Sequence, residues 1–303
     1  MEPRSIAVIG LGLIGGSLAR DAAVLGIRVS AYDTNASALR AALREGVVTT
    51  ALDASLAGVE DADVVVLAVP VTAAIETLGA AAGRLRRARC ITDVCSTKRS
   101  MVEAARRLGL GSRFIGGHPL AGDHRAGWDA ARAGLFHGVP VYLCPADDDA
   151  VAVAEPVERL WRAVGGVTEM MDAIEHDRLL ASTSHLPQVV STALARSILA
   201  AGIGLDQLGP GGRDMTRLAR SAADVWTPIA FHNAAFLDAA LARMEAELAR
   251  LRRALAQADA EAVRHFFQPD LEHCGSDARK AASGAASAKS PPRTGTEGEV
   301  PNL

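Results

Sequence analysis

Residues 5–16 read SIAVIGLGLIGG, and this stretch decides the fold. Its first part, residues 5–10, is a short apolar run rich in β-branched side chains, which is typical of a buried parallel strand. The glycines that follow have the spacing Gly-x-Gly-x-x-Gly, and residues 13–25 have the apolar spacing of a helix. A strand that turns through such glycines into a helix is typical of a dinucleotide-binding unit.

Each position of the glycine motif has a predicted task. Gly10 permits the tight turn, Gly12 lets the backbone approach a pyrophosphate, and Gly15 lets the helix pack closely on the strand. Leu13 and Ile14 open the helix, whose free N–H groups would face the phosphates. The alternative is that these glycines form only a tight turn, which the surrounding strand and helix disfavour.

The end of the second strand predicts which cofactor is bound. Asp33 closes the predicted strand 27–33 and lies 18 residues after Gly15. Its carboxylate would accept hydrogen bonds from a ribose hydroxyl and would repel the 2′-phosphate of NADP, and Thr34 and Asn35, not an arginine, follow it directly. NAD is therefore favoured. Pro70 ends the apolar strand 64–70, so it is expected at the carboxyl edge of the sheet, near the cofactor.

The rest of the N-terminal half continues the alternation of strands and helices. Strands are expected at 90–94 and 138–144, and helices at 98–108 and about 150–164. This pattern predicts an α/β Rossmann-type doubly wound sheet as an NAD-binding domain over residues 1–172. Beyond it, apolar residues recur every three to four positions, which predicts an all-α substrate and dimerisation domain over 173–270. Residues 271–303 are small and polar, so they are expected to be disordered.

Composition excludes several function classes. The formal net charge of -3 implies no basic surface for nucleic acid. The N-terminus has no signal-peptide pattern, and no apolar run approaches the ~18 residues of a membrane span. The cysteines have no metal-ligand spacing, so no metal is expected, and unpaired thiols suit a reducing cytoplasm.

Residues 113–128, RFIGGHPLAGDHRAGW, concentrate titratable side chains among glycines. Glycine and proline break helices and strands, so the whole stretch is predicted to be a loop. Oxidation of an alcohol by a nicotinamide cofactor needs a base for the hydroxyl proton, and histidine is the usual one. His118 and His124 lie in this stretch, and His185 lies in a helical one. The remaining histidines are interpreted as surface or structural: His137, His176, His232, His265 and His273.

Four further motifs, in order, resemble one known family. They are TDVCSTK (92–98), GGHPLAG (116–122), SHLP (184–187) and DMTRLARSAADVW (214–226). Together with the glycine motif they resemble the TyrA family, the prephenate and arogenate dehydrogenases of tyrosine biosynthesis. The resemblance covers roughly residues 5–265. It implies NAD-dependent oxidative decarboxylation of a cyclohexadienyl carboxylate. A homodimer is expected for a separate reason, because long apolar helices beyond a Rossmann unit tend to need a partner.

The resemblance also implies roles for individual residues. His118 matches the catalytic histidine that accepts the ring hydroxyl proton, and Ser96 matches the serine beside that hydroxyl. Arg217 matches the arginine that binds a substrate carboxylate. His185 matches a histidine near the substrate entrance, and Trp226 matches an aromatic of the pocket. Ser96 could instead cap the helix that begins near residue 98, Arg217 could be one of several surface arginines, and Trp226 could pack in a core.

This chain departs from the family pattern after the HPLAG run. Some members carry a Glu two residues beyond that run, whereas here Asp123 follows directly and His124 takes the Glu position. A carboxylate at Asp123 could pair with the ammonium group of arogenate, so arogenate is a candidate substrate beside prephenate. Pairing of Asp123 with Arg125 is the alternative.

Other readings of the chain remain open. A dehydrogenase of amino-prephenate in specialised metabolism fits the same residues. A non-catalytic NAD-binding regulator is disfavoured because His118 and Arg217 are both present. A β-hydroxyacid dehydrogenase would place a catalytic lysine in the helical domain, and residues 173–270 contain none.

Overall fold

The computed structural model describes residues 3–122, 125–152 and 154–268. The described residues fall into two compact units, one ending at Ala242 and the other beginning at Arg243. The first unit contains the whole sheet and most of the helices, and α12 (Ala234–Ala256) runs from the first unit into the second.

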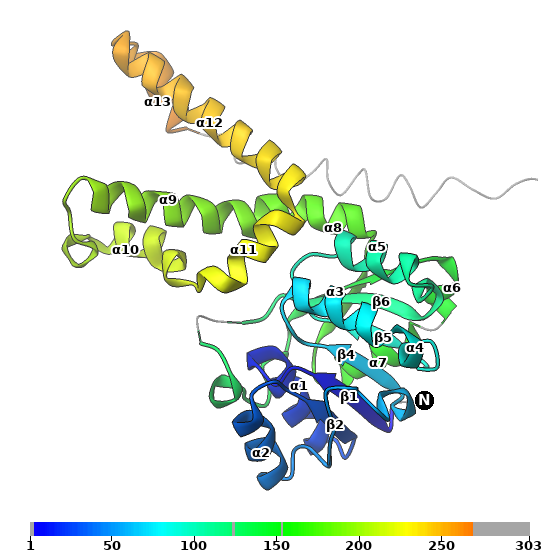
Figure 1. The fold of residues 1–303 in the computed structure, drawn as a ribbon. Coiled ribbons are helices and arrows are strands. Elements are labelled where there is room, and N and C mark those ends of the chain that lie inside the picture. The colour runs from blue at the N-terminus through cyan, green and yellow to red at the C-terminus, as the bar shows by residue number, and fades with distance from the viewer. Residues whose placement is uncertain (1–2, 123–124, 153, 269–303) are drawn as a thin grey trace, which may run out of the picture. The chain divides into compact units, whose positions relative to one another are not determined.

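An eight-stranded sheet is the centre of the first unit (Figure 1). The strand order is β3-β2-β1-β4-β5-β6-β7-β8, and every neighbouring pair is parallel except β6 and β7. The strands are β1 (Ser5–Ile9), β2 (Arg28–Tyr32), β3 (Thr50–Ala51), β4 (Val64–Leu67), β5 (Ile91–Asp93), β6 (Phe114–Pro119), β7 (Pro140–Pro145) and β8 (Val167–Met170). The order reverses between β1 and β4, and in such sheets ligands bind beyond the carboxyl ends of the strands at that point.

Both faces of the sheet are covered, because the strands are apolar on both sides. In β1, Ile6 and Val8 belong to one core cluster, and Ala7 and Ile9 belong to the other. The first cluster includes residues of α1 and α7, and the second includes residues of α3 and α5. The helices of this part are α1 (Leu13–Val24), α2 (Ala36–Arg44), α3 (Val71–Ala80), α4 (Ala82–Leu85), α5 (Arg99–Arg107), α6 (Asp148–Ala152) and α7 (Glu155–Ala163). The predicted doubly wound α/β fold is confirmed.

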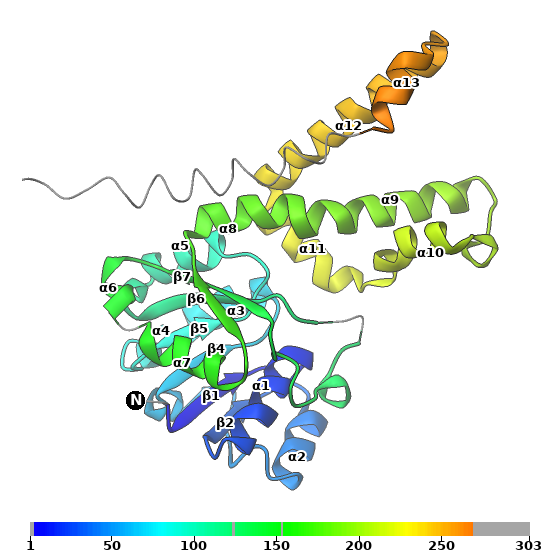
Figure 2. The same cartoon turned by 180° about the vertical axis from the view of Figure 1, so that it is seen from behind.

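After the sheet, the described residues form only helices and their connections. The helices are α8 (Ala173–Leu180), a π-helical turn (Ala181–His185), α9 (Leu186–Ala200), the 3-10 helix η5 (Leu205–Gln207), α10 (Pro210–Thr216), the 3-10 helix η6 (Arg217–Arg220), α11 (Ala223–His232), α12 and α13 (Ala260–Phe266). Helix α9 packs against η6 and, as Figure 2 also shows, against α10. None of the helices described is both long enough and apolar enough to span a membrane.

Two expectations about local structure are wrong. The stretch 113–128 is not all loop, because residues 114–119 form the fully buried strand β6. Its glycines serve close packing: a Cβ on Gly117 would lie 2.4 Å from the backbone oxygen of Asp93. The helix expected at about 150–164 is divided into α6 and α7, and Pro156 stands in the first turn of α7, where its missing N–H costs nothing.

Candidate active site

The turn from β1 into α1 has the shape that a dinucleotide needs. Gly10 has φ +100°, and a Cβ there would lie 2.4 Å from the Ala68 oxygen. A Cβ on Gly15 would lie 2.1 Å from the Gly10 oxygen, whereas nothing lies within 4 Å of a Cβ on Gly12. Helix α1 begins without a side-chain cap and without an acid in its first turn. The open space at Gly12 and the uncapped helix end therefore fit a pyrophosphate.

Asp33 and Pro70 lie at the carboxyl edges of their strands, as expected. The Asp33 carboxylate accepts hydrogen bonds from the backbone N–H groups of Leu11 (2.6 Å) and Asn35 (2.6 Å). It therefore holds the glycine turn in place, and the remaining lone pairs of its oxygens are available to a ribose. Pro70 directly precedes α3.

The side chains that open α1 connect this turn with the HPLAG run. Leu13 is buried, and Ile14 packs partly against the core beneath the sheet. A Cβ on Gly122 would lie 4.0 Å from Cδ1 of Ile14, so the end of the HPLAG run passes next to α1. A cofactor on α1 would therefore lie close to the segment that carries His118.

His118 is the first member of a buried hydrogen-bonded chain. Its Nδ1 lies 2.9 Å from Nε2 of His176, and Nδ1 of His176 lies 2.8 Å from Oδ1 of Asp177. His118 is on β6, while His176 and Asp177 are on α8. Burial, and then the neighbouring His176, Lys98 and His185, hold the pKa of His118 well below its usual range. Burial likewise lowers the pKa of His176.

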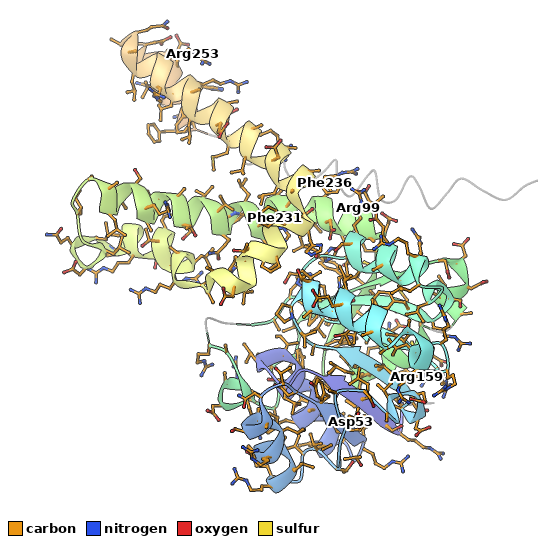
Figure 3. The ribbon with its side chains drawn as sticks, in the orientation of Figure 1. Asp53, Arg99, Arg159, Phe231, Phe236 and Arg253 are labelled. Carbon is orange, nitrogen blue, oxygen red and sulfur yellow. The ribbon has the colours of Figure 1, made fainter. Side chains whose placement is uncertain are left out.

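Asp177 also fixes the start of α5, which follows the TDVCSTK motif that contains Ser96. Its two carboxylate oxygens accept hydrogen bonds from the backbone N–H groups of Lys98 (2.7 Å) and Arg99 (3.0 Å; labelled in Figure 3). The helix begins at Arg99, and no side chain of its own N-cap residue caps it. The capping role considered for Ser96 is thus filled by Asp177, and Ser96 lies half-buried two residues before Lys98.

A buried ion pair lies behind the strand that carries His118. The Lys98 ammonium group bonds to the Asp93 carboxylate and donates to the Gly117 oxygen (2.6 Å), and both charged side chains have no exposed surface. Asp93 also accepts from the Gly117 N–H (3.1 Å). Buried charges persist only when they are paired and hydrogen-bonded, so this pair fixes β6 against β5 just before His118.

His185 joins the same network from the opposite end. The Asn233 amide nitrogen donates to the Asp177 backbone oxygen (2.8 Å) and lies 3.0 Å from Nδ1 of His185. A carbonyl oxygen only accepts, so the amide nitrogen is the group that faces both partners, and His185 accepts at Nδ1. The proton of the neutral ring is then on Nε2, which is buried and has no partner among the described residues. Burial lowers the pKa of His185 to about 4.

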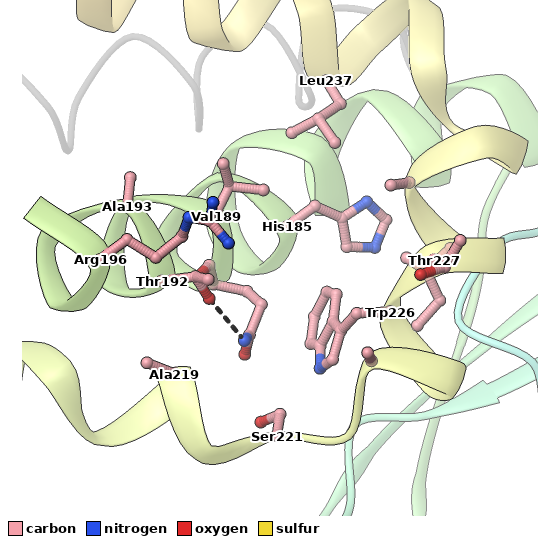
Figure 4. A pocket seen from close by; sticks show the side chains of 14 residues that line it. His185, Val189, Thr192, Ala193, Arg196, Ala219, Ser221, Trp226, Thr227 and Leu237 are labelled. Atoms are coloured by element: carbon pink, nitrogen blue, oxygen red, sulfur yellow. Dashed lines mark hydrogen bonds between the residues drawn. The ribbon is translucent and has the colours of Figure 1, made fainter. Parts of the chain in front are cut away.

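His185 and Trp226 line a pocket of about 630 Å³ in the helical part of the first unit (Figure 4). Their rings meet edge to face, with centroids 5.9 Å apart. The wall is mostly apolar and includes the polar side chains of Gln188, Thr192 and Arg196. Such a pocket suits a small ring compound with a few polar groups.

Arg217 is not among the residues that line this pocket. It is exposed on η6, although Ala219 and Ser221 just after it do line the pocket. Gln188 donates to the Leu218 oxygen (2.8 Å) and so holds η6 on α9. Asp123 and His124 lie outside the described residues. Among the residues that are described, no group of His, Cys, Asp or Glu is arranged to hold a metal ion.

Sequence reasoning missed several members of the network. They are Asp93, Lys98, His176, Asp177 and Asn233. A signal existed for Lys98, because it is the only lysine before residue 280 in an arginine-rich chain. The sequence predicts His176 to be a surface or structural histidine, and its acidic neighbour at 177 was the available signal that its ring bridges a carboxylate and His118.

Comparisons with known proteins agree with this geometry. The family model "Prephenate dehydrogenase, nucleotide-binding domain" matches residues 18–170, and "Prephenate dehydrogenase, dimerization domain" matches residues 172–269. Cyclohexadienyl dehydrogenase of Zymomonas mobilis is 34% identical over 88% of this chain and 93% of its own length. Prephenate dehydrogenase of Bacillus subtilis is 32% identical over 87% of this chain and 73% of its own length.

A solved structure agrees in three dimensions. The crystal structure of Aquifex aeolicus prephenate dehydrogenase, in complex with hydroxyphenyl propionate and NAD+, has a TM-score of 0.75 and 30% identity. The match covers 88% of this chain and 94% of that one. Both domains and most of the length are therefore matched, and the chain belongs to the prephenate dehydrogenase family.

Proposed function

We propose that this chain oxidises prephenate with NAD and releases carbon dioxide and 4-hydroxyphenylpyruvate. The observation that carries the proposal is the buried His118, whose lowered pKa keeps its ring neutral. It lies near the carboxyl end of β6, next to β5, and Ser96 follows soon after β5. The names of the matched relatives support the same reaction.

The cofactor site that we propose consists of Gly10, Gly12, Leu13, Ile14, Gly15, Asp33 and Pro70. The open space at Gly12 would admit the pyrophosphate, and the two oxygens of Asp33 would receive a ribose hydroxyl. When NAD is bound, it supplies the acceptor for a hydride.

His118 acts as the general base in this proposal. As the ring carbon loses its hydride, Nε2 of His118 takes the hydroxyl proton and the ring becomes a ketone. The ring carboxylate then leaves as carbon dioxide, its bonding electrons make the ring aromatic, and the oxygen becomes a phenolate. The proton on His118 returns to that oxygen. A neutral histidine is required at the start, and the lowered pKa of His118 provides it at pH 7.

The remaining predicted residues would orient the substrate. Ser96 would hydrogen-bond the ring hydroxyl, and Arg217 would bind a carboxylate with its planar fork of donors. The unpartnered Nε2–H of His185 would donate to a substrate oxygen, and Trp226 would pack against the ring. The proximity of η6 to the pocket supports the role of Arg217, because its neighbours Ala219 and Ser221 line that pocket.

We further propose an NAD-binding domain over residues 1–172, a helical domain over 173–270 and a homodimer formed through the helical domain. Several large apolar side chains of its helices are exposed, and Phe231 on α11 is 79% exposed (Figure 3). The match to a dimerisation-domain family supports this assembly. The buried centre of a dimer interface is more apolar than the rest of a protein surface, so such side chains would be covered in the dimer.

The deciding experiment measures NADH formation by absorbance, with purified full-length chain and either prephenate or arogenate. We expect activity with prephenate, and loss of kcat by about 10²–10⁴-fold in His118→Asn with unchanged NAD affinity. His137→Asn, the same change at an exposed histidine, is the matched control and should keep its activity. Absence of turnover with both substrates, despite NAD binding, would overturn the proposal and favour a non-catalytic regulator or an amino-prephenate dehydrogenase.

Arogenate turnover bears on the predicted role of Asp123, which lies outside the described residues. If its carboxylate pairs with the substrate ammonium group, Asp123→Ala lowers kcat/KM for arogenate and leaves prephenate unaffected. Equal loss on both substrates, or loss on neither, would contradict that role.

A further inference from the structure

The direction of each hydrogen bond around His176 follows from its partners. The Asp177 carboxylate accepts from the N–H groups of Lys98 and Arg99, and it only accepts as a carboxylate. The 2.8 Å contact from His176 Nδ1 is therefore an N–H donated to Asp177 Oδ1. A neutral His176 then has a bare lone pair on Nε2. Since that atom lies 2.9 Å from Nδ1 of His118, it accepts the Nδ1–H of His118.

This chain of bonds determines where the proton of His118 resides. With Nδ1–H donated to His176, the neutral His118 ring keeps its Nε2 lone pair free. That is the tautomer a general base needs, because only a bare nitrogen takes a proton. The opposite tautomer would place two lone pairs against each other across the 2.9 Å contact.

We propose that His176, oriented by Asp177, is a positioning residue that holds His118 in its Nδ1–H tautomer. The inference rests on the proposed role of His118 as the base, and it adds the residue that prepares His118 for that role. His176 is fully buried, and its ring meets the rings of both His118 and Tyr142 edge to face, with centroids 5.1 and 5.6 Å apart. The ring therefore has one orientation available.

The charged groups around the pair define its response to pH. Burial and the positive charges carried by Lys98 and, when protonated, by His176 and His185 disfavour protonation of His118, whereas neutral His176 accepts a hydrogen bond from it at Nε2. His176 is faced by Lys98, by Asp177 and by Asp93, and the ring of Tyr142 covers one side. When His118 becomes an imidazolium, its Nδ1–H···Nε2 bond to His176 becomes charge-assisted and stronger. Loss of the acceptor would thus destabilise the protonated form of His118.

Kinetics of two His176 variants separate positioning from simple packing. His176→Leu removes the acceptor, and we expect kcat to fall by about 10²-fold or more, with KM for both substrates unchanged. The acidic limb of kcat/KM should also move to lower pH, because the pKa of His118 falls further. His176→Gln can accept from His118 with its amide oxygen and donate to Asp177 with its nitrogen, so it should restore most of kcat and the original limb.

A structural role alone predicts a different pattern. It would reduce the fraction of folded enzyme. The maximum of the pH profile of kcat/KM would then fall, and the pH at which activity is lost on the acidic side would not change. His137→Leu, the same replacement at an exposed histidine, is the matched control and should change neither. The proposal would be overturned if the acidic limb of the pH profile of kcat/KM in His176→Leu stayed at its original pH. It would also be overturned if folded His176→Gln did not regain kcat.

A second readout is independent of activity. Nitrogen-15 NMR of histidine-labelled full-length protein distinguishes a protonated ring nitrogen from a bare one, and the His118→Asn spectrum assigns the His118 signals. At pH 7 we expect Nδ1 protonated and Nε2 bare in the unsubstituted protein, and a mixture of tautomers in His176→Leu. A proton on Nε2 of His118 in the unsubstituted protein would overturn the inference. If prephenate is not oxidised, the proposed function fails while the spectrum still decides the tautomer.

Discussion

The environment of His118 predicts how activity depends on pH. Burial, and after it the neighbouring His176, Lys98 and His185, lower the pKa of this histidine well below 6.5. A base works when it is deprotonated, so a lowered pKa keeps it active at more acidic pH. We expect the acidic limb of kcat/KM for prephenate to lie clearly below pH 6.5, because this profile reports the free enzyme. A limb at or above pH 6.5 would mean that another group controls activity.

The tight packing at Gly117 limits which substitutions β6 tolerates next to His118. A Cβ there would lie 2.4 Å from the Asp93 oxygen and 2.9 Å from Oγ1 of Thr92, and backbone atoms cannot move aside cheaply. We expect Gly117→Ala to lower the free energy of unfolding by about 2 kcal/mol, measured by urea denaturation. Gly79→Ala is the control, since nothing lies within 4 Å of its Cβ and alanine favours a helix. An unchanged free energy of unfolding in Gly117→Ala would show that β5 and β6 can move apart to make room for the methyl group.

For single residues, the sequence could indicate which side chains take part in binding and catalysis, but not which distant side chains contact one another. The glycines of residues 10–15 and the aspartate at 33 stand in one local unit, so spacing alone predicted their neighbourhood. The bond between His118 and His176 joins residues 58 positions apart, and Asn233 reaches Asp177 across 56 positions. No local pattern encodes such distances, so the network became visible only in the fold.

The turn between β1 and α1 allows a test of the cofactor site at the scale of an element. A methyl group on Gly12 meets nothing within 4 Å, whereas one on Gly15 would lie 2.1 Å from the Gly10 oxygen. We therefore expect Gly12→Ala to weaken NAD binding at least about tenfold with little change in the urea midpoint. Gly15→Ala should lose both NAD binding and stability.

NAD titration by calorimetry and urea denaturation of both variants give the two readouts. Equal NAD affinity in Gly12→Ala and the unsubstituted protein would place the pyrophosphate elsewhere. Equal destabilisation by both substitutions would mean that the space beside Gly12 is not open in solution.

The sequence predicted those strands and helices that have a clear hydrophobic pattern. Strands β1 and β4 are continuous apolar runs, and the sequence identified both. Strand β6 was missed because its Gly116, Gly117, His118 and Pro119 read as loop residues. They form a strand because they pair with β5 and β7, and glycine is needed because the Lys98 side chain and the Asp93 backbone occupy the space of a larger residue. Tertiary packing there overrides local propensity.

For the whole molecule, the buried histidines predict sensitivity to acid. His118, His176 and His185 are all buried, and burial lowers the pKa of each. The unfolded chain binds protons near pH 6.5, and the folded chain binds them only at lower pH. Below pH 6.5 the unfolded state thus holds more protons, and the free energy of unfolding falls as the pH falls.

His185 gives this effect a magnitude. Its pKa of about 4 in the folded chain, against about 6.5 when unfolded, corresponds to a loss of about 2 kcal/mol between pH 7 and pH 5. We expect urea denaturation to show at least this decrease in the intact protein. In His185→Gln, which cannot take up a proton, the decrease should be smaller by about the same amount, whatever the stability of the variant at pH 7. The comparison uses the pH dependence of each protein, so lost packing around residue 185 cancels. Identical pH dependence in both would mean that His185 titrates normally in the folded state, and that its Nε2–H is in contact with water and not reserved for a substrate.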